Sequence, residues 1–400
     1  MKAPINAGRA GPKPEPTALT GIAMKRLVMV GLGPVHLRVL HQMAALRVAG
    51  AEVTWLGAPS AAVWPALVPE ALEYSSTGGA TAVSERLELT DLWRRADVSV
   101  LAAWPQSLDA RARRLSLPDG REIDYDVLSL DLAPHVDRQA IPGAREHALF
   151  LHPLDSLVTF WPSLQQLMAQ RSLDVVVVGG GAAAFETVML LSAPRAAPAE
   201  CVPRVVWVTG AEPVLAQYTP ALREHALQCC KARAVTVLPA QCVAIEPGWV
   251  HLDNGARVAC DAPLMATSPN APAWLAGSTL MLDEQGWPQV LPSLQSVSTP
   301  DVFVTRLGSG LSSAGQLDTP AVSAQVGAAL ADNLRRAVGG GDIQDLGRLR
   351  PGWAFLRTGD GQAVASRGTW LLEGRWVAWW QARQARASWR ELQLSSSDGR

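Results

Sequence analysis

The chain has 400 residues, more than one ordinary core holds, so we expect two or more domains. Apolar residues make up 48% and charged residues 18%, a globular balance, and the net charge of −1 gives no reason to expect nucleic acid as a partner. Five cysteines without a CxxC pair argue against a disulfide framework and for a reducing compartment, so we expect a cytoplasmic protein.

The first 23 residues contain four prolines and no apolar core. This composition predicts a disordered tail over residues 1–23 and not a signal peptide. No run of 18 apolar residues occurs anywhere in the chain, so no membrane-spanning helix is expected.

The first predicted element is a strand, glycine turn and helix that begins at Lys25. A short apolar strand leads into Gly31 and Gly33, and Pro34 follows at the first helical position, where its missing N–H costs little. His36 stands where a dinucleotide fingerprint has its third glycine, which weakens this motif. The next predicted strand, Ala51–Leu56, has no acid at its end to hold a ribose.

Residues 60–84 show no clear period and predict a long irregular loop. Further along, residues 113–123 predict a hairpin with Asp119-Gly120 at its turn. A buried strand is expected next, over residues 125–132.

The strongest signal in the chain is LDVVVVGGGAAAFE at residues 173–186. Its apolar run is typical of a strand buried on both faces of a parallel sheet. Gly179 and Gly181 allow a tight turn and a close backbone approach, and Ala184 takes the third position, where a small residue lets the helix pack on the strand. Strand, turn and helix start together predict a dinucleotide site, with an ordinary strand–helix turn as the alternative.

The two halves of the chain repeat one order of elements. After the second glycine turn come a helix, the strand at residues 204–209, a hairpin with Asn254-Gly255 at its turn and the strand at residues 261–267. The first half runs through the same sequence of elements. We therefore expect two nucleotide-binding modules of one design, which can hold two dinucleotides face to face for hydride transfer.

The remainder predicts a strand at residues 300–304, a helix at 319–338 and a tail unit rich in tryptophan. A helix at residues 374–392 would place Trp376, Trp380 and Ala387 on one face. An adjacent basic stripe is formed by Trp379, Arg383, Arg386 and Arg390. Tryptophan with arginine on an amphipathic helix suits a membrane surface with anionic lipid. Packing on the body or on a second subunit, as in a homodimer, is the alternative.

Taken together, the chain resembles the pyridine nucleotide-disulfide oxidoreductases with two dinucleotide domains. It is most similar to the branch of type II NADH dehydrogenases and of the flavoprotein domain found fused to selenide, water dikinase. The resemblance rests on LVMVGLGPVHLRVL, LSLPDGREIDYDVLSLDLAP, VVVVGGGAAAFE, SVSTPDVFV, AVSAQVGAALADNLRRA and FLRTGDGQAVASRG.

The resemblance implies FAD on the first module and NAD(P)H on the second. The implied FAD-binding positions are Gly31, Gly33, Pro34 and His36. Gly179, Gly181 and Ala184 would meet the NAD pyrophosphate, and Glu186 would face the nicotinamide end. Glu186 can also be read as an acid in the first turn of the helix that complements the helix dipole. NAD and NADP stay open, because only Glu212 lies near the end of the strand at residues 204–209.

One motif departs from the family. A Gly-Asp pair that binds the flavin ribityl chain aligns here with Arg306-Leu307. Ser309 can replace it if the loop is longer by two residues, with a neutral hydrogen bond in place of a charge-assisted one.

The sequence therefore predicts an α/β protein with two Rossmann-like modules. We expect an FAD module at 24–150 plus 268–345, a NAD(P) module at 151–267 and a C-terminal unit at 346–400. The predicted function is an FAD-dependent NAD(P)H oxidoreductase that reduces a quinone or another small acceptor, at the inner face of a membrane if the tryptophan helix binds lipid. A flavin-poor or catalytically silent relative that acts as a partner module is the alternative. No metal site is expected, since the histidines and cysteines lack zinc spacing.

Overall fold

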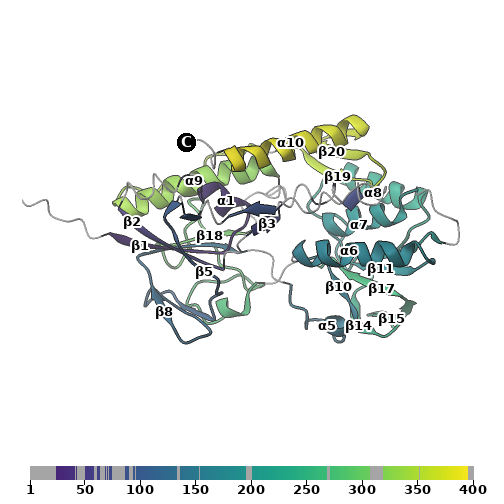
Figure 1. Ribbon diagram of the computed structural model, residues 1–400, viewed down its shortest axis with the longest axis horizontal. Coiled ribbons are helices and arrows are strands. Elements are labelled where there is room, and N and C mark those ends of the chain that lie inside the picture. Colours follow the sequence, from purple (N-terminus) through teal and green to yellow (C-terminus); the bar gives the residue numbers. More distant parts are fainter. Residues whose placement is uncertain are drawn as a thin grey trace, which may run out of the picture.

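The structure is a computed structural model that describes residues 24–394 with gaps at 41, 43–49, 58–60, 64–67, 69, 71, 74–85, 90–92, 95, 133–135, 153, 195–200, 268–270, 307–318 and 351. Two five-stranded parallel sheets form two modules that stand side by side (Figure 1). The predicted α/β class with two Rossmann-like modules is confirmed.

The first module has the strand order β18-β9-β1-β2-β5. Helices α1 and α9 cover one face of the sheet, and a small antiparallel sheet, β6-β7-β8, contributes to the core on the other face. Its elements are β1 (Lys25–Val30), α1 (Pro34–Leu40), β2 (Ala51–Leu56), β3 (Ala61–Val63), β4 (Arg86–Glu88), β5 (Ser99–Leu101), β6 (Ser107–Asp109), β7 (Arg114–Ser116), β8 (Glu122–Asp124), β9 (Val127–Leu132), η4 (Ala273–Leu275), β18 (Val302–Arg306) and α9 (Pro320–Gly339).

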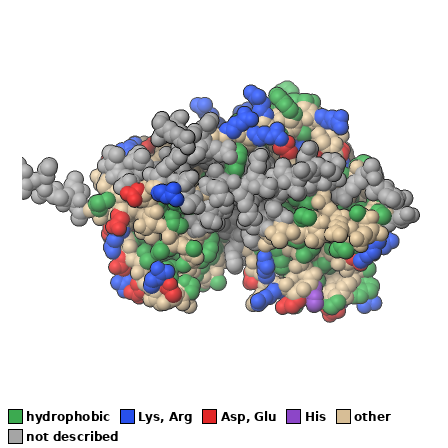
Figure 2. Space-filling view, in the orientation of Figure 1, with side chains coloured by type: hydrophobic (Ala, Val, Ile, Leu, Met, Phe, Trp, Pro, Cys, Tyr) green, Lys and Arg blue, Asp and Glu red, His purple; other side chains and the backbone are tan. Residues whose placement is uncertain are grey.

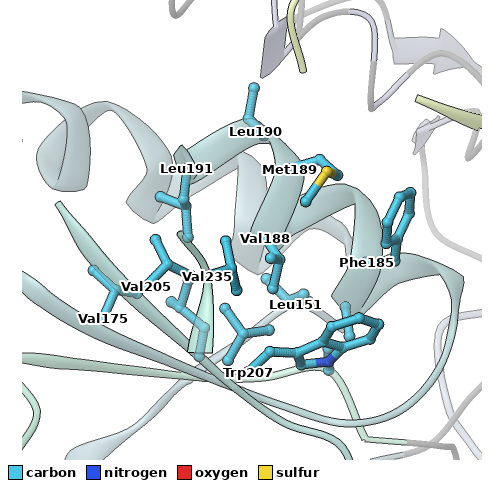
Figure 3. Close-up of a cluster of buried hydrophobic side chains, with 14 of the residues drawn as sticks. Leu151, Val175, Phe185, Val188, Met189, Leu190, Leu191, Val205, Trp207 and Val235 are labelled. Carbon is cyan, nitrogen blue, oxygen red and sulfur yellow. The ribbon is translucent and has the colours of Figure 1, made fainter. Parts of the chain in front are cut away.

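The second module has the strand order β10-β17-β11-β12-β13. Its elements are α5 (Ala144–His147), β10 (Leu149–Phe150), α6 (Leu154–Met168), β11 (Asp174–Val178), α7 (Ala182–Ser192), β12 (Arg204–Val208), α8 (Pro220–Ala232), β13 (Thr236–Leu238), β14 (Cys242–Glu246), β15 (Trp249–Leu252), β16 (Arg257–Ala259) and β17 (Ala262–Met265). Val188 and Leu191 of α7 point onto the sheet, and Phe185 lies beside Trp207 with ring centroids 6.1 Å apart (Figure 3).

The two glycine turns are built alike. In each module an indole N–H from the neighbouring strand reaches the carbonyl of the first turn glycine. Trp55 donates to Gly31 O over 2.8 Å, and Trp207 donates to Gly179 O over 2.6 Å. A Cβ placed on Gly31 would lie 2.2 Å from Asp131 O, and a Cβ placed on Gly179 would lie 2.2 Å from Ala266 O. Asp131 lies near the end of β9, and Ala266 directly follows β17. Asp131 and Ala266 are therefore equivalent positions of an internal repeat.

The C-terminal unit joins the two modules. It consists of β19 (Ala354–Arg357), β20 (Ala363–Arg367), β21 (Trp370–Gly374) and α10 (Arg375–Leu394). Leu356 and Val364 belong to the core of the second module, whereas Trp389 near the end of α10 belongs to the core of the first. Helix α10 accordingly runs along one edge of the molecule across both modules (Figure 1). None of the described helices is long and apolar enough to cross a membrane.

Candidate dinucleotide-binding site

The second glycine turn presents an open helix start. Gly179 has a φ of +135°, and a side chain there would strike Ala266 O, so only glycine fits. Gly181 caps α7 in an extended conformation, and a Cβ built on it meets nothing within 4 Å. The first helical bond runs from Phe185 N to Gly181 O over 3.1 Å, which leaves the N–H groups of the preceding residues without intrahelical partners. With no acid in the first turn of α7, this end of the helix suits an anion.

The end of β12 leaves the choice between NAD and NADP open. Thr209 and Gly210 follow β12, and Gly180 packs closely against Thr209 O, at 2.7 Å from the place of a Cβ. Leu215 N donates to Gly180 O over 2.7 Å and so fixes the turn. Glu212 lies exposed beyond the strand. Apart from Glu212, the described residues 209–213 after β12 carry no acid for a ribose 2′-hydroxyl and no basic group for a 2′-phosphate.

Glu186 lies further along α7 and is held by the C-terminal unit. Its Oε1 accepts a hydrogen bond from the backbone N–H of Arg357 over 2.9 Å. Burial raises the pKa of Glu186 to about 7, and Glu73 acts in the same direction, whereas Arg357 opposes the rise. Glu186 therefore exchanges a proton near neutral pH at a point where α7 meets the C-terminal hairpin.

A buried ion pair between Glu73 and Arg357 supports this junction, and Leu72 beside Glu73 packs in the core of the second module. Arg357 and Glu73 are 8% and 6% exposed, and the Arg357 Nε donates to Glu73 Oε2 over 2.7 Å. Glu73 also accepts from Gly361 N, so one carboxylate holds both ends of the turn between β19 and β20. Arg233 at the end of α8 donates to Met189 O over 2.8 Å and to Asp360 over 2.8 Å, which fastens the same turn to the second module.

We expect Glu186→Gln to change how stability depends on pH. The folded chain binds the Glu186 proton more tightly than the unfolded chain, so the Glu186 contribution to stability is lost as the pH rises from about 4.5 through 7. Glutamine keeps the acceptor for Arg357 N and removes the titration. The free energy of unfolding of the variant minus that of the wild type should be about 1–2 kcal/mol larger at pH 8 than at pH 5. Urea unfolding at both pH values measures this, with Glu212→Gln as the exposed control; a parallel shift at both pH values would contradict it.

The first glycine turn is arranged differently, because a carboxylate lies in it. Asp131 is 2% exposed, and its Oδ2 accepts from the backbone N–H of His36 over 2.8 Å. Its Oδ1 accepts from the hydroxyl of Thr305 over 3.1 Å. A Cβ built on Gly33 would lie 2.6 Å and 2.7 Å from the two carboxylate oxygens. Glycine is required at position 33 because Asp131 fills the space beside it.

An indole lies next to the same turn. Gly57 follows β2 with a φ of +69°, and a Cβ built there would lie 2.8 Å from ring atoms of Trp104. The same ring is 3.6 Å from the place of a Cβ on Gly31. The Trp104 side chain thus covers the carboxyl ends of β1 and β2 and is itself 45% exposed.

His36 is part of the packing of the first module. The residue is fully buried, and its ring is bonded on both sides, with Nδ1 2.9 Å from Gly31 O and Nε2 2.8 Å from Ser129 Oγ. Since a carbonyl only accepts, Nδ1 carries the proton and Nε2 accepts from the serine. The side chain fits at the third glycine position because the strand opposite it presents a small hydroxyl residue.

Acid should destabilise the protein through His36. Burial lowers the pKa of His36, although Asp131 opposes this, so the unfolded chain takes up a proton below about pH 6.5 that the folded chain refuses. The His36 contribution to stability is therefore lost as the pH falls from 6.5 towards 5, whereas the Glu186 contribution grows over the same range. In His36→Gln this loss should be smaller than in the wild type and in the exposed control His147→Gln, as measured by thermal unfolding at both pH values. A slope remains, because burial lowers the pKa of His152 too. Equal slopes in all three proteins would contradict this assignment.

Several predicted features lie elsewhere. Ser309 and Leu307 are outside the described residues. Within the described ranges, no group of three His, Cys, Asp or Glu side chains is placed to hold a metal ion. On α10 the buried face consists of Val377, Ala378, Ala382, Ala385 and Trp389. Trp376 and Trp379 are 54% and 63% exposed, and basic and hydrophobic side chains gather along this edge (Figure 2).

Two parallel modules in succession, each with a glycine turn at the end of its central strand, define a protein of the two-module dinucleotide-binding class. The chain belongs to the pyridine nucleotide-disulphide oxidoreductase family, whose model matches residues 25–305. It is similar to NADH dehydrogenase-like proteins of two Mycobacterium tuberculosis strains, with 27% identity over 237 residues. That match covers 54% of this chain and 57% of each relative, so the chain matches little more than half of their length.

Solved structures show the same fold at low identity. The sulfide:quinone oxidoreductase of Aquifex aeolicus aligns with a TM-score of 0.72 and 15% identity over 93% of this chain and 92% of its own. NDH2 of Plasmodium falciparum, in complex with NADH, aligns with a TM-score of 0.69 and 11% identity over 93% of this chain and 97% of its own. At sequence identities this low, the structural similarity shows a shared fold and nothing more.

Proposed function

We propose that this protein oxidises NADH or NADPH held on the second module and passes the electrons to a small acceptor such as a quinone. The open helix start at Gly181 carries the proposal, because it offers unpaired N–H groups and empty space to a pyrophosphate. Membership of an oxidoreductase family supports the reaction class. NADH dehydrogenase-like relatives and a sulfide:quinone oxidoreductase of the same fold support the choice of donor and acceptor.

The proposed hydride transfer needs little chemistry from protein side chains. The reduced nicotinamide gives up a hydride, and a quinone that takes this hydride together with one proton from solvent becomes a quinol. The protein must bind the pyrophosphate, orient the ring and keep both partners together. In this proposal Glu186, which the family resemblance places at the nicotinamide end, is positioned by Arg357 N–H over 2.9 Å.

FAD, which the family resemblance places on the first module, does not fit the described residues there. The Asp131 carboxylate lies beside Gly33, and the Trp104 indole lies beside Gly57. No step of the proposed reaction therefore passes through a resident flavin. The same observation favours a second candidate function, in which the chain binds the nicotinamide dinucleotide as a partner module without catalysis.

The test is a titration of the full chain with NADH and then with NADPH, in which tryptophan fluorescence reports binding. Anaerobic addition of a water-soluble quinone follows. Saturable binding with loss of the nicotinamide absorbance on adding quinone supports the proposed oxidoreductase. Binding without oxidation supports the partner module, and failure of both nucleotides to bind contradicts both candidates.

We further propose that the outer face of α10 reaches a membrane surface, where a quinone is available. Trp376 and Trp379 of α10 and Trp370 of the preceding strand β21 are each more than half exposed, and the Arg383 guanidinium lies 5.8 Å from the Trp379 ring centroid. Indoles combined with arginine favour anionic interfaces. The protein should sediment with anionic vesicles and not with neutral ones. Trp376→Ala with Trp379→Ala should abolish this, and unchanged sedimentation would contradict it.

A further inference from the structure

We infer that the first module holds no FAD, because side chains of the chain itself fill the places of the pyrophosphate and the ribose. This inference is independent of the proposed reaction, which needs only the second module. The internal repeat supplies the comparison, since corresponding positions of the two modules can be set side by side in one molecule.

The place of the pyrophosphate differs most clearly between the modules. At Gly181 the space that a side chain would fill is empty to 4 Å, whereas at Gly33 it holds both oxygens of Asp131. The position equivalent to Asp131 in the second module is Ala266, which has no charge and no polar side-chain atom. The second glycine of a dinucleotide fingerprint is small so that the pyrophosphate can approach the backbone. In the first module the Asp131 carboxylate occupies the space through which a pyrophosphate would approach the backbone.

Few donors remain at the first turn. Leu37 N donates to Gly33 O over 3.0 Å, so the first helical bond leaves the backbone nitrogens of residues 33–36 outside the ladder. Pro34 has no N–H, and the N–H of His36 is taken by Asp131. Among residues 33–36, at most Gly33 and Val35 keep an N–H group for a ligand. The turn of α7 has no proline and no carboxylate in the corresponding places.

The charge of Asp131 opposes a phosphate. Its carboxylate is 2% exposed, so solvent screens it little, and its two partners are neutral donors and not cations. A like unit charge about 4 Å from a phosphate, at an effective dielectric constant near 20, weakens binding roughly a hundredfold to a thousandfold. The carboxylate also satisfies the helix start that a pyrophosphate would otherwise satisfy, which explains why the glycine turn persists without that ligand.

The place of the ribose is filled as well. The residue after the second strand of such a module bears the acid that holds the ribose hydroxyls. Here that residue is Gly57, and the Trp104 ring lies 2.8 Å from the place of its Cβ. A bound adenosine would have to displace this indole from the ends of β1 and β2.

The test uses the full chain, expressed with riboflavin in the medium and purified without added flavin. Its visible spectrum should show no flavin, and titration with FAD should give no saturable quenching of flavin fluorescence. The matched variants are Asp131→Asn, which keeps an oxygen for His36 N–H and removes the charge, and Asp131→Asn combined with Trp104→Ala. The double variant should bind FAD at least tenfold more tightly than the wild type. Circular dichroism and NADH titration of each variant check the fold and the second module.

The outcomes separate the two claims. A yellow wild-type protein with one FAD per chain would overturn the inference, and it would leave NAD(P)H oxidation standing if NADH bleached the flavin. A colourless protein whose variants also ignore FAD, while still binding NADH, would overturn the assignment of Asp131 and Trp104 as the closing groups. A colourless protein that fails to bind NADH would leave the closed first turn intact and contradict the proposed function.

Discussion

Replacing Arg357 by methionine is expected to lower the free energy of unfolding by about 3–5 kcal/mol. The guanidinium is buried, and its loss would leave the Glu73 carboxylate, 6% exposed, without its cation. Because Glu73 also holds Gly361 N, the hairpin that positions Glu186 should loosen at the same time. Urea denaturation of the full chain measures the change.

A second substitution and a matched control make this expectation specific. Adding Glu73→Gln to Arg357→Met removes the uncompensated charge and should restore much of the lost stability. The control is Arg386→Met, which breaks the pair with Glu70 at 2.6 Å, where the arginine side chain is 54% exposed. That change should cost less than about 1 kcal/mol. Equal losses of the free energy of unfolding in Arg357→Met and Arg386→Met would contradict the expectation that the buried pair stabilises the fold more than the exposed pair.

Gly181→Asp should weaken NADH binding about a hundredfold or more. The new side chain has room, since nothing lies within 4 Å of the Cβ, so the fold should tolerate it. Its carboxylate would stand where the pyrophosphate is proposed to bind, and a like charge about 4 Å away costs about 4 kcal/mol at an effective dielectric constant of 20. Fluorescence titration of both proteins measures the dissociation constants.

The control for this change is Gly277→Asp. Gly277 is exposed in the first module, and a Cβ built there also meets nothing within 4 Å, so the two substitutions add the same charge at similarly open positions. NADH should bind the control variant as tightly as the wild type. Unchanged affinity in Gly181→Asp would show that the dinucleotide binds elsewhere or not at all.

Much of the fold could be predicted from local patterns. The strand at Ala51–Leu56 has the expected bounds, and the helix expected at residues 319–338 is α9, Pro320–Gly339. Apolar runs, N-terminal threonine and proline, and glycine turns act within a few residues, so they can be read along the chain. The repeat of the two halves was visible for the same reason, and the shared Trp-to-glycine contact shows how closely the modules correspond.

The site depended on contacts that no local pattern reveals. Asp131 lies in a stretch that the family resemblance identified, but its contact with His36 spans 95 positions. Setting the two halves side by side, with Asp131 opposite Ala266, would have indicated that only one turn carries an acid. The pair of Glu73 and Arg357 is 284 positions apart and has no signal of that kind. A buried charge pair between distant elements follows from the packed structure and not from the sequence.

The most direct test of the account is calorimetric titration of NADH into the wild type, Gly181→Asp and Asp131→Asn. We expect one site per chain in the wild type and in Asp131→Asn, and binding about a hundredfold weaker or more in Gly181→Asp. Binding that survives Gly181→Asp and depends on Asp131 would place the nicotinamide dinucleotide on the first module and contradict the account.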